Sequence, residues 1–135
     1  MGLTVSHGAF DAAYSAFNRF RAFLLESIGG SFPPHDNEEL KDNYWYYGDG
    51  YSTETHKGLT EFFGHSDCDG YIDPDMCLLV ADELECILPN IIRLEKEKGK
   101  GQGHVLSQGG YVQLTKYFIQ GCRLAAKRNE NLEFR

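Results

Sequence analysis

The chain has 135 residues, of which 41% are hydrophobic, including nine Phe and eight Tyr. This length and composition predict a single domain, residues 1–135, whose core needs no disulfide, cofactor or structural metal. The 13 basic and 20 acidic residues give a net charge of −7, which argues against binding to long nucleic acids or to anionic membrane surfaces through charge alone.

The sequence shows no signal for membrane insertion or secretion. It contains no run of about 18 apolar residues, and its first residues lack a basic stretch followed by an apolar core. The four cysteines match neither a disulfide scaffold nor a zinc-finger spacing, so reduced thiols are expected. We therefore expect a cytoplasmic protein, in the host cytosol if a phage encodes it.

Apolar residues that recur every three or four positions predict a first helix from Ala9 to Ile28. Gly29 and Gly30 are suited to end it, because glycine accepts the left-handed conformation found after helices. From residue 31 to residue 52 this periodicity is lost, and Asn, Asp, Gly and Pro separate a cluster of aromatic residues. This segment is predicted to be a long ordered loop.

Three further helices are predicted after the aromatic loop. A short one covers residues 55–63, and a longer one starts at Asp73 and Pro74, which supply an N-cap and an N1 proline. Pro89 is expected to kink or restart that helix. The last helix begins at Ser107 or Gln108 and ends near Arg128, after a Gly-rich stretch that looks flexible.

The first and last residues of the chain alternate apolar and polar side chains, as short strands do. The two segments are residues 3–5 and 132–134, and pairing them would join the termini. The sequence thus predicts a mainly α fold: a single domain of about four helices with a long aromatic loop and a short two-stranded pairing of the termini.

The most distinctive polar segment is HSDCDG, residues 65–70, between two predicted helices. It is similar to half of an EF-hand calcium loop. With Gly70 at loop position 6, however, His65 and Met76 occupy positions 1 and 12, where calcium requires carboxylates. Ordinary calcium binding is therefore not expected.

Two other interpretations of this loop remain open. His65, Asp67 and Asp69, with Cys68, offer nitrogen, oxygen and sulfur ligands for a transition metal or a catalytic cluster. Alternatively, the carboxylates cap and turn the chain while Gly70 supplies a positive φ.

A second polar group lies near the N-terminus. Ser15 and Arg19 are four residues apart and share a helical face that could bind an anion, although a solvated face is the alternative. His7 precedes them in a Ser-His-Gly sequence. A catalytic triad of Ser15, His7 and Asp67 can be drawn, but no nucleophile elbow supports it.

Tyr44 and Trp45 begin the aromatic cluster of the long loop. Because Tyr and Trp combine a large apolar area with a polar tip, they could stack on a nucleobase or sugar, or anchor a partner protein. They could equally fold back over the core as a lid.

Three segments together resemble a family of small uncharacterised proteins of bacteriophages and bacteria. They are residues 1–7 with the helix motif AYSAFNRFR at 13–21, the HSDCDG loop with ADEL at 81–84, and FIQGCRLAA at 118–126 with LEF at 132–134. The resemblance implies no particular activity. It does imply that polar residues of these segments meet around a shared centre, namely His7, Ser15, Arg19, His65, Asp67 and Asp69.

The sequence and the resemblance favour a non-enzymatic accessory protein that binds a small molecule or a host protein. One version is a phage counter-defence protein that sequesters a nucleotide signal, with Arg19, Arg21 or Arg123 facing phosphates and Tyr44 and Trp45 stacking on bases. A metal-binding or metal-dependent hydrolase module at residues 65–69 is one alternative. An acidic inhibitor of a host nucleic-acid-binding factor is another, and a homo-oligomer is compatible with each.

Overall fold

The computed structural model describes residues 2–30, 51 and 54–135. Five helices and two antiparallel strand pairs are found there, which confirms the predicted mainly α fold. The elements are β1 (Gly2–Val5), β2 (Phe10–Ala13), α1 (Tyr14–Ser27), α2 (Lys57–Gly64), β3 (Tyr71–Ile72), α3 (Pro74–Lys98), α4 (Gly103–Ser107), α5 (Tyr111–Lys127) and β4 (Leu132–Glu133). Tyr44 and Trp45 lie outside the described residues.

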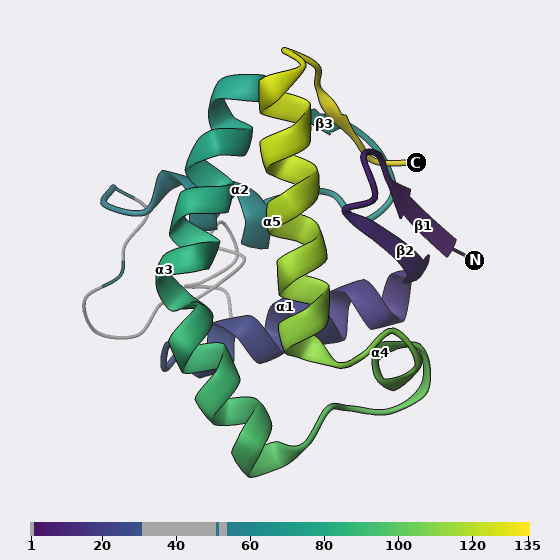
Figure 1. Ribbon diagram of the computed structural model, residues 1–135, viewed down its shortest axis with the longest axis vertical. Helices are drawn as coiled ribbons and strands as arrows, with labels where there is room; N and C mark the ends of the chain where they lie inside the picture. The colour runs from purple at the N-terminus through teal and green to yellow at the C-terminus, as the bar shows by residue number, and fades with distance from the viewer. Residues whose placement is uncertain (1, 31–50, 52–53) are drawn as a thin grey trace, which may run out of the picture.

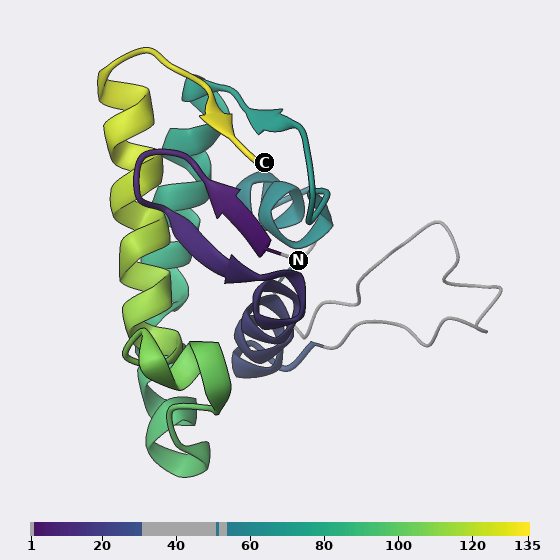
Figure 2. The same cartoon turned by 90° about the vertical axis from the view of Figure 1, so that its right-hand side faces the viewer.

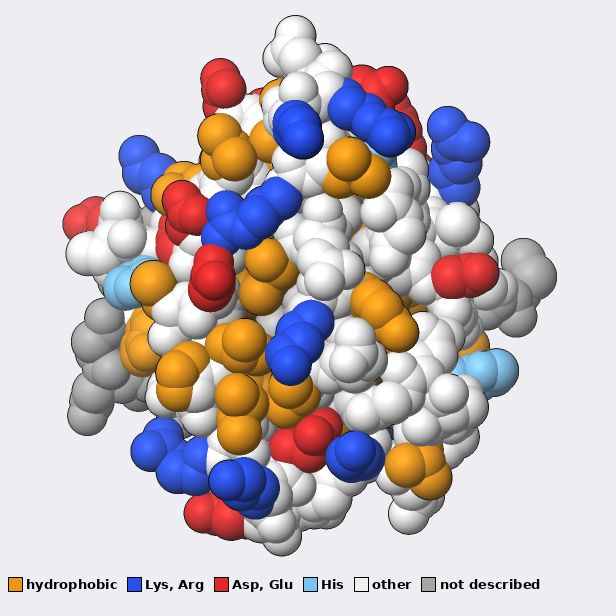
Figure 3. Space-filling view, in the orientation of Figure 1, with side chains coloured by type: hydrophobic (Ala, Val, Ile, Leu, Met, Phe, Trp, Pro, Cys, Tyr) orange, Lys and Arg blue, Asp and Glu red, His pale blue; other side chains and the backbone are white. Residues whose placement is uncertain are grey.

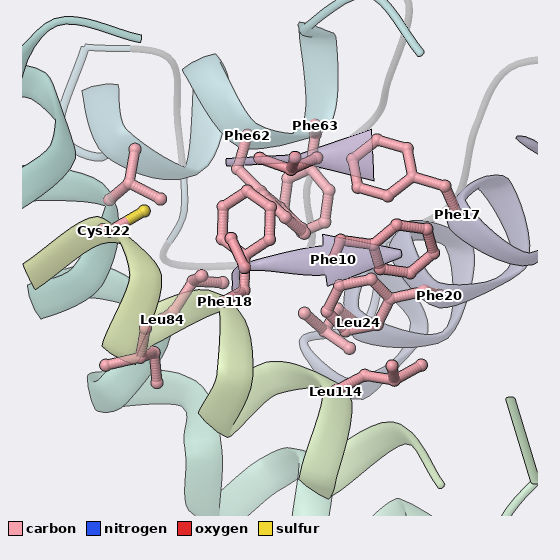
Figure 4. Packing of buried hydrophobic residues seen from close by; sticks show 14 of the residues in the cluster. Phe10, Phe17, Phe20, Leu24, Phe62, Phe63, Leu84, Leu114, Phe118 and Cys122 are labelled. Atoms are coloured by element: carbon pink, nitrogen blue, oxygen red, sulfur yellow. The ribbon is translucent and has the colours of Figure 1, made fainter. Parts of the chain in front are cut away.

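Helices α3 and α5 run side by side, and α1 crosses beside them (Figure 1). The β1–β2 hairpin lies next to α5 and leads directly into α1 (Figure 2). Between these elements, buried phenylalanines pack ring against ring (Figure 4). Phe17 of α1 lies 6.1 Å from Phe62 of α2 and 6.4 Å from Phe118 of α5, measured between ring centroids. The core is thus shared by three helices from distant parts of the sequence.

The hairpin corrects the predicted start of the first helix. Residues 10–13 pair with residues 2–5, so α1 begins at Tyr14 rather than Ala9. The turn between the strands consists of His7 and Gly8, with φ angles of 62° and 74°, and the N–H of Ala9 donates to the carbonyl of Ser6 over 3.2 Å. Positive φ at both central residues is the signature of a type I′ turn, whose twist suits a two-residue hairpin.

The predicted pairing of the termini is confirmed. Thr4 and Arg135 exchange two backbone hydrogen bonds of 2.9 Å each, and Val5 forms a β-bridge with Phe134. Strand β4 also pairs with β3, the strand that follows the HSDCDG loop. The C-terminal segment therefore lies between the hairpin and that loop.

The later helices differ from their predicted form in two places. Helix α3 starts at Pro74 with Asp73 as N-cap, as predicted, but it continues through Pro89 to Lys98. The last helix, α5, begins at Tyr111 rather than at residue 107 or 108, because Gly109 and Gly110 adopt φ angles of 102° and 97°, which a right-handed helix cannot contain. The short helix α4, which was not predicted, precedes it. Among the described residues, no helix combines the length and the apolar character that crossing a lipid bilayer requires.

Candidate functional site

The HSDCDG loop is fixed to α1 by Arg21, a residue that is only 7% exposed. Its Nη1 donates to the carbonyl oxygens of Phe62, Phe63 and His65 at 3.3, 3.2 and 2.6 Å. Phe62 and Phe63 belong to the last turn of α2, and His65 is the residue that follows this helix. Arg21 therefore caps α2 from another element and sets the path by which the chain enters the loop.

Burial lowers the pKa of Arg21 to about 10, against the opposing effect of the negative charge of Asp67. The guanidinium still carries its charge at neutral pH. Because Nη1 has two N–H groups, one of them is shared between two of the three carbonyl oxygens. Its Nη2 donates to Asn18 over 2.9 Å, and Asn18 in turn donates to the Asp67 carboxylate over 3.1 Å. Arg21, Asn18 and Asp67 thus form one network from helix to loop.

His65 is held in place by contacts on both edges and on one face of its ring. Its Nδ1 and Nε2 lie 2.9 and 3.0 Å from the backbone carbonyl oxygens of Ser66 and Tyr71, and its ring stacks on Phe134 with centroids 3.9 Å apart. Because a carbonyl oxygen only accepts hydrogen bonds, neither ring nitrogen directs a free lone pair toward a shared centre. His65 serves here as a packing residue.

The metal prediction gains no support from this geometry. In residues 2–30, 51 and 54–135, no group of three or more His, Cys, Asp or Glu side chains is arranged to hold a metal ion. Asp67 accepts from Asn18, Asp69 is exposed, and the Ser66 hydroxyl accepts from the backbone N–H groups of Cys68 and Asp69. A tight metal site needs several donors aimed at one point, and the described part of this loop shows no such group.

A different place in the fold brings polar side chains together. An open pocket of about 360 Å³ lies between the hairpin, the end of α4 and the middle of α5; Figure 2 shows these three elements side by side. Most of the lining area is apolar, and the lining residues that carry polar side chains are Thr4, Ser6, His7, Asp11, Gln108 and Tyr117. The volume is within the range of pockets that hold small ligands.

Contacts around the pocket fix its shape. The Nε2 of Gln108 donates to the backbone carbonyl of Asp11 over 2.5 Å and so ties α4 to the hairpin. On the other side, Gly121 of α5 allows the hairpin to approach closely, since a Cβ at this glycine would lie 2.6 Å from the Cβ of Ala9. The pocket is therefore bounded by elements that are packed or hydrogen-bonded to one another.

Two lining residues, Ser6 and His7, belong to a chain of three side chains that ends at Glu130. The Ser6 Oγ lies 2.7 Å from the Nδ1 of His7, and the Nε2 of His7 lies 3.0 Å from the Glu130 carboxylate. The backbone N–H of Glu133 donates to the Ser6 Oγ over 2.8 Å. The side chain of His7 is 11% exposed and that of Glu130 53%, so the ring is sheltered while the carboxylate faces solvent.

The predicted site residues do not gather at one centre. His7 lines the hairpin pocket, whereas His65 and Asp67 belong to the Arg21 network. Ser15 and Arg19 are exposed on α1, and Arg19 lies toward Gly103 at the start of α4. The segments on which the predicted family resemblance rests do meet, but through Asn18, Arg21, Ser6, Glu133 and Phe134.

Several residues of both clusters escaped prediction because their partners are remote in sequence. Glu130 is 123 residues from His7, and Gln108 is 97 residues from Asp11. The hairpin turn, in contrast, has a local signal. His7 tolerates a positive φ angle and is followed by Gly8, and the segments on both sides of this pair alternate, which together indicate a hairpin. That signal was available in the sequence.

The face formed by α3 and α5 mixes exposed apolar and charged side chains (Figure 3). Leu78 and Ile92 of α3 are 47% and 37% exposed. Arg123 of α5 forms ion pairs with Asp82 and Glu85 of α3, and these hydrogen bonds and charges raise its pKa against the effect of partial burial. Arg123 and Arg21 are thus engaged within the protein rather than directed toward a phosphate.

Comparisons of the chain with protein-family models, with curated proteins and with solved structures give no match.

Proposed function

We propose that this protein binds a small molecule and that the hairpin pocket is the binding site. The observation that carries the proposal is the convergence of remote polar groups on one hollow: His7 and Asp11 come from the hairpin, Gln108 follows α4, and Tyr117 lies on α5. Such convergence distinguishes a binding site from a set of solvated surface residues.

The lining chemistry favours a compact ligand that is neutral or positively charged. Asp11 places a carboxylate at the pocket, and none of the described residues that line it is Lys or Arg. Tyr117, which is 40% exposed, offers a ring face and a hydroxyl. A phosphate group would meet a negative charge without a compensating cation, so the nucleotide version of the proposal has less support than a neutral or cationic ligand.

Three probes of nearly equal size test both parts of the proposal. Benzamidine is cationic, benzamide neutral and benzoate anionic, and each has about nine non-hydrogen atoms. At about 0.5 kcal/mol per atom, binding would reach about −4.5 kcal/mol, a dissociation constant near a millimolar. We expect amide shifts in NMR spectra of residues around His7, Asp11 and Tyr117, with affinity decreasing from benzamidine to benzamide to benzoate.

Two variants test whether the probes bind in the pocket and whether the charge of Asp11 sets the preference among them. Tyr117→Ala is expected to weaken the binding of all three probes. Benzamidine is expected to bind about fivefold more tightly than benzamide because of the exposed Asp11 charge, and Asp11→Asn is expected to abolish this preference. Ser15→Ala, an exposed serine outside the pocket, is the matched control. Shifts that spread over the whole surface, or that survive Tyr117→Ala unchanged, contradict the proposal. If benzoate or AMP bound more tightly than benzamidine, the proposed preference for neutral or cationic ligands would be wrong.

A further inference from the structure

We propose that Ser6 is a nucleophile that attacks small esters in the hairpin pocket, with His7 as its general base and Glu130 as the residue that positions His7. This inference rests on the proposed pocket, but it assigns a reaction rather than binding alone. It arises from the relay formed by Ser6, His7 and Glu130.

The hydrogen bonds of the relay select one arrangement of protons. The Glu130 carboxylate only accepts hydrogen bonds, so the Nε2 of His7 must carry the proton that lies between them. In the neutral ring, Nδ1 is then a lone pair, and the Ser6 hydroxyl donates to it over 2.7 Å. The opposite tautomer would direct a lone pair of Nε2 at the negative carboxylate and is disfavoured. Ser6 is therefore already hydrogen-bonded to a base.

A third contact orients the serine oxygen. The backbone N–H of Glu133 donates to the Ser6 Oγ over 2.8 Å. This hydrogen bond and the one to His7 together fix the rotamer of Ser6. The positive end of the N–H dipole also favours negative charge on the Ser6 oxygen as the proton leaves. Ser6, His7 and Gly8 all line the pocket, so an ester bound there would lie beside the turn that carries the serine.

The turn holds His7 in an uncommon backbone conformation. A φ angle of 62° is uncommon for residues other than glycine, and asparagine fills this turn position more readily than histidine. Among the described residues, no acceptor takes a hydrogen bond from the backbone N–H of Gly8, which leaves that group available for charge on an ester carbonyl oxygen. The conformation is thus compatible with a reactive site built on the turn.

The reaction proceeds in two balanced steps. The Ser6 Oγ forms a bond to the carbonyl carbon as its proton passes to the Nδ1 of His7; the bond to the alcohol oxygen then breaks, and Nδ1 returns the proton to that oxygen. The products are acyl-Ser6 and an alcohol. In the second step His7 takes a proton from water, the hydroxide oxygen bonds to the acyl carbon, and the carboxylic acid leaves as Ser6 regains the proton.

The probe for this reaction is p-nitrophenyl acetate, which releases p-nitrophenol as Ser6 is acetylated. We expect intact mass spectrometry to show a single acetyl adduct and peptide mapping to place it on Ser6. His7→Asn preserves the turn but cannot act as a base, and we expect it to lower the acetylation rate about 100-fold. Glu130→Gln keeps an acceptor but removes the charge; because Glu130 is half exposed, we expect about a fivefold loss in kcat with KM unchanged.

Ser6→Ala is expected to abolish the adduct, and Ser6→Cys, which retains a nucleophile, to restore acetylation at the same position. Ser15→Ala and Ser107→Ala are the serine controls and are expected to match the parent protein, with circular dichroism verifying the fold of every variant. Acetylation confined to lysines or the N-terminus overturns the inference, as does equal acetylation of Ser6 in the folded His7→Asn variant. Binding of benzamidine or benzamide without Ser6 acetylation would overturn the reaction while leaving the proposed binding function intact.

Discussion

Arg21 combines a buried charge with hydrogen bonds that no shorter or simpler side chain can reproduce. Its guanidinium reaches three backbone carbonyls and Asn18 while lying 4.5 Å from the centre of the Phe17 ring. A lysine has one nitrogen and cannot reach these acceptors from the same rotamer. We predict that Arg21→Lys lowers the free energy of unfolding by about 2 kcal/mol, measured by urea denaturation.

The neighbouring Arg19 gives a matched control, because it is exposed on the same helix. Arg19→Lys is expected to change the free energy of unfolding by less than about 0.5 kcal/mol. Equal effects of the two substitutions would show that water satisfies the carbonyls at the end of α2 as well as Arg21 does.

The four cysteines are predicted to separate into two classes of reactivity. Cys68 and Cys86 are exposed, whereas Cys77 and Cys122 are buried between α3 and α5. A hydrogen bond to Cys77, together with burial, raises the pKa of the Cys122 thiol well above its usual value, so it forms little reactive thiolate near neutral pH. We expect a thiol reagent such as DTNB to modify two cysteines quickly in the folded protein and all four in urea. Four fast reactions without denaturant would contradict this packing.

At the scale of elements, local signals explain which predictions succeeded. The start of α3 was predictable because the Asp73 side chain accepts from the N–H of Met76, three residues away, and Pro74 fits the first turn. The start of α1 was not, because Phe10 and Ala13 satisfy a helical spacing although they lie in β2. Whether they form a strand depends on pairing with β1, and the apolar period alone does not distinguish the two.

The contact between α2 and α3 depends on Gly58. A Cβ at this position would lie 2.6 Å from the backbone carbonyl oxygen of Leu79, and α2 is further tied to α3 by hydrogen bonds from its first N–H groups to Glu83. We predict that Gly58→Ala destabilises the protein by about 2 kcal/mol despite the higher helix propensity of alanine, because the helices must separate. The midpoint of urea denaturation measures the loss.

Gly2→Ala is the comparison for this prediction. At Gly2 the closest atom to an added Cβ is the carbonyl oxygen of Ala12 at 3.7 Å, an ordinary contact, and little change is expected. A gain in stability from Gly58→Ala would show that α2 can shift away from α3 without cost.

At the scale of the whole molecule, the three segments on which the predicted family resemblance rests meet at the C-terminal strand. Ser6 of the hairpin turn accepts from Glu133, and His65 of the HSDCDG loop stacks on Phe134. The sequence indicated that these segments lie together. Most of the residues that make the contacts, however, differ from those that were predicted to meet. The contacts join positions more than 60 residues apart, and no local pattern specifies which side chains face one another.

Phe134 is the residue through which this long-range assembly is best tested. It is 3% exposed, and its ring packs against Phe17 of α1, Phe118 of α5 and the ring of His65. Phe134→Ala would leave a cavity where these elements join, and we predict a loss of about 3–4 kcal/mol in the free energy of unfolding.

Hydrogen exchange distinguishes a cooperative assembly from a frayed end. Because the backbone of the C-terminal segment bonds to both Thr4 and Gly70, we expect amides of the hairpin and of the HSDCDG loop to lose protection together in the Phe134→Ala variant. Tyr71→Ala, at a side chain that is 57% exposed, should leave both protected. Loss of protection in residues 132–135 alone would mean that the hairpin and the loop are held by α1 without the C-terminal strand.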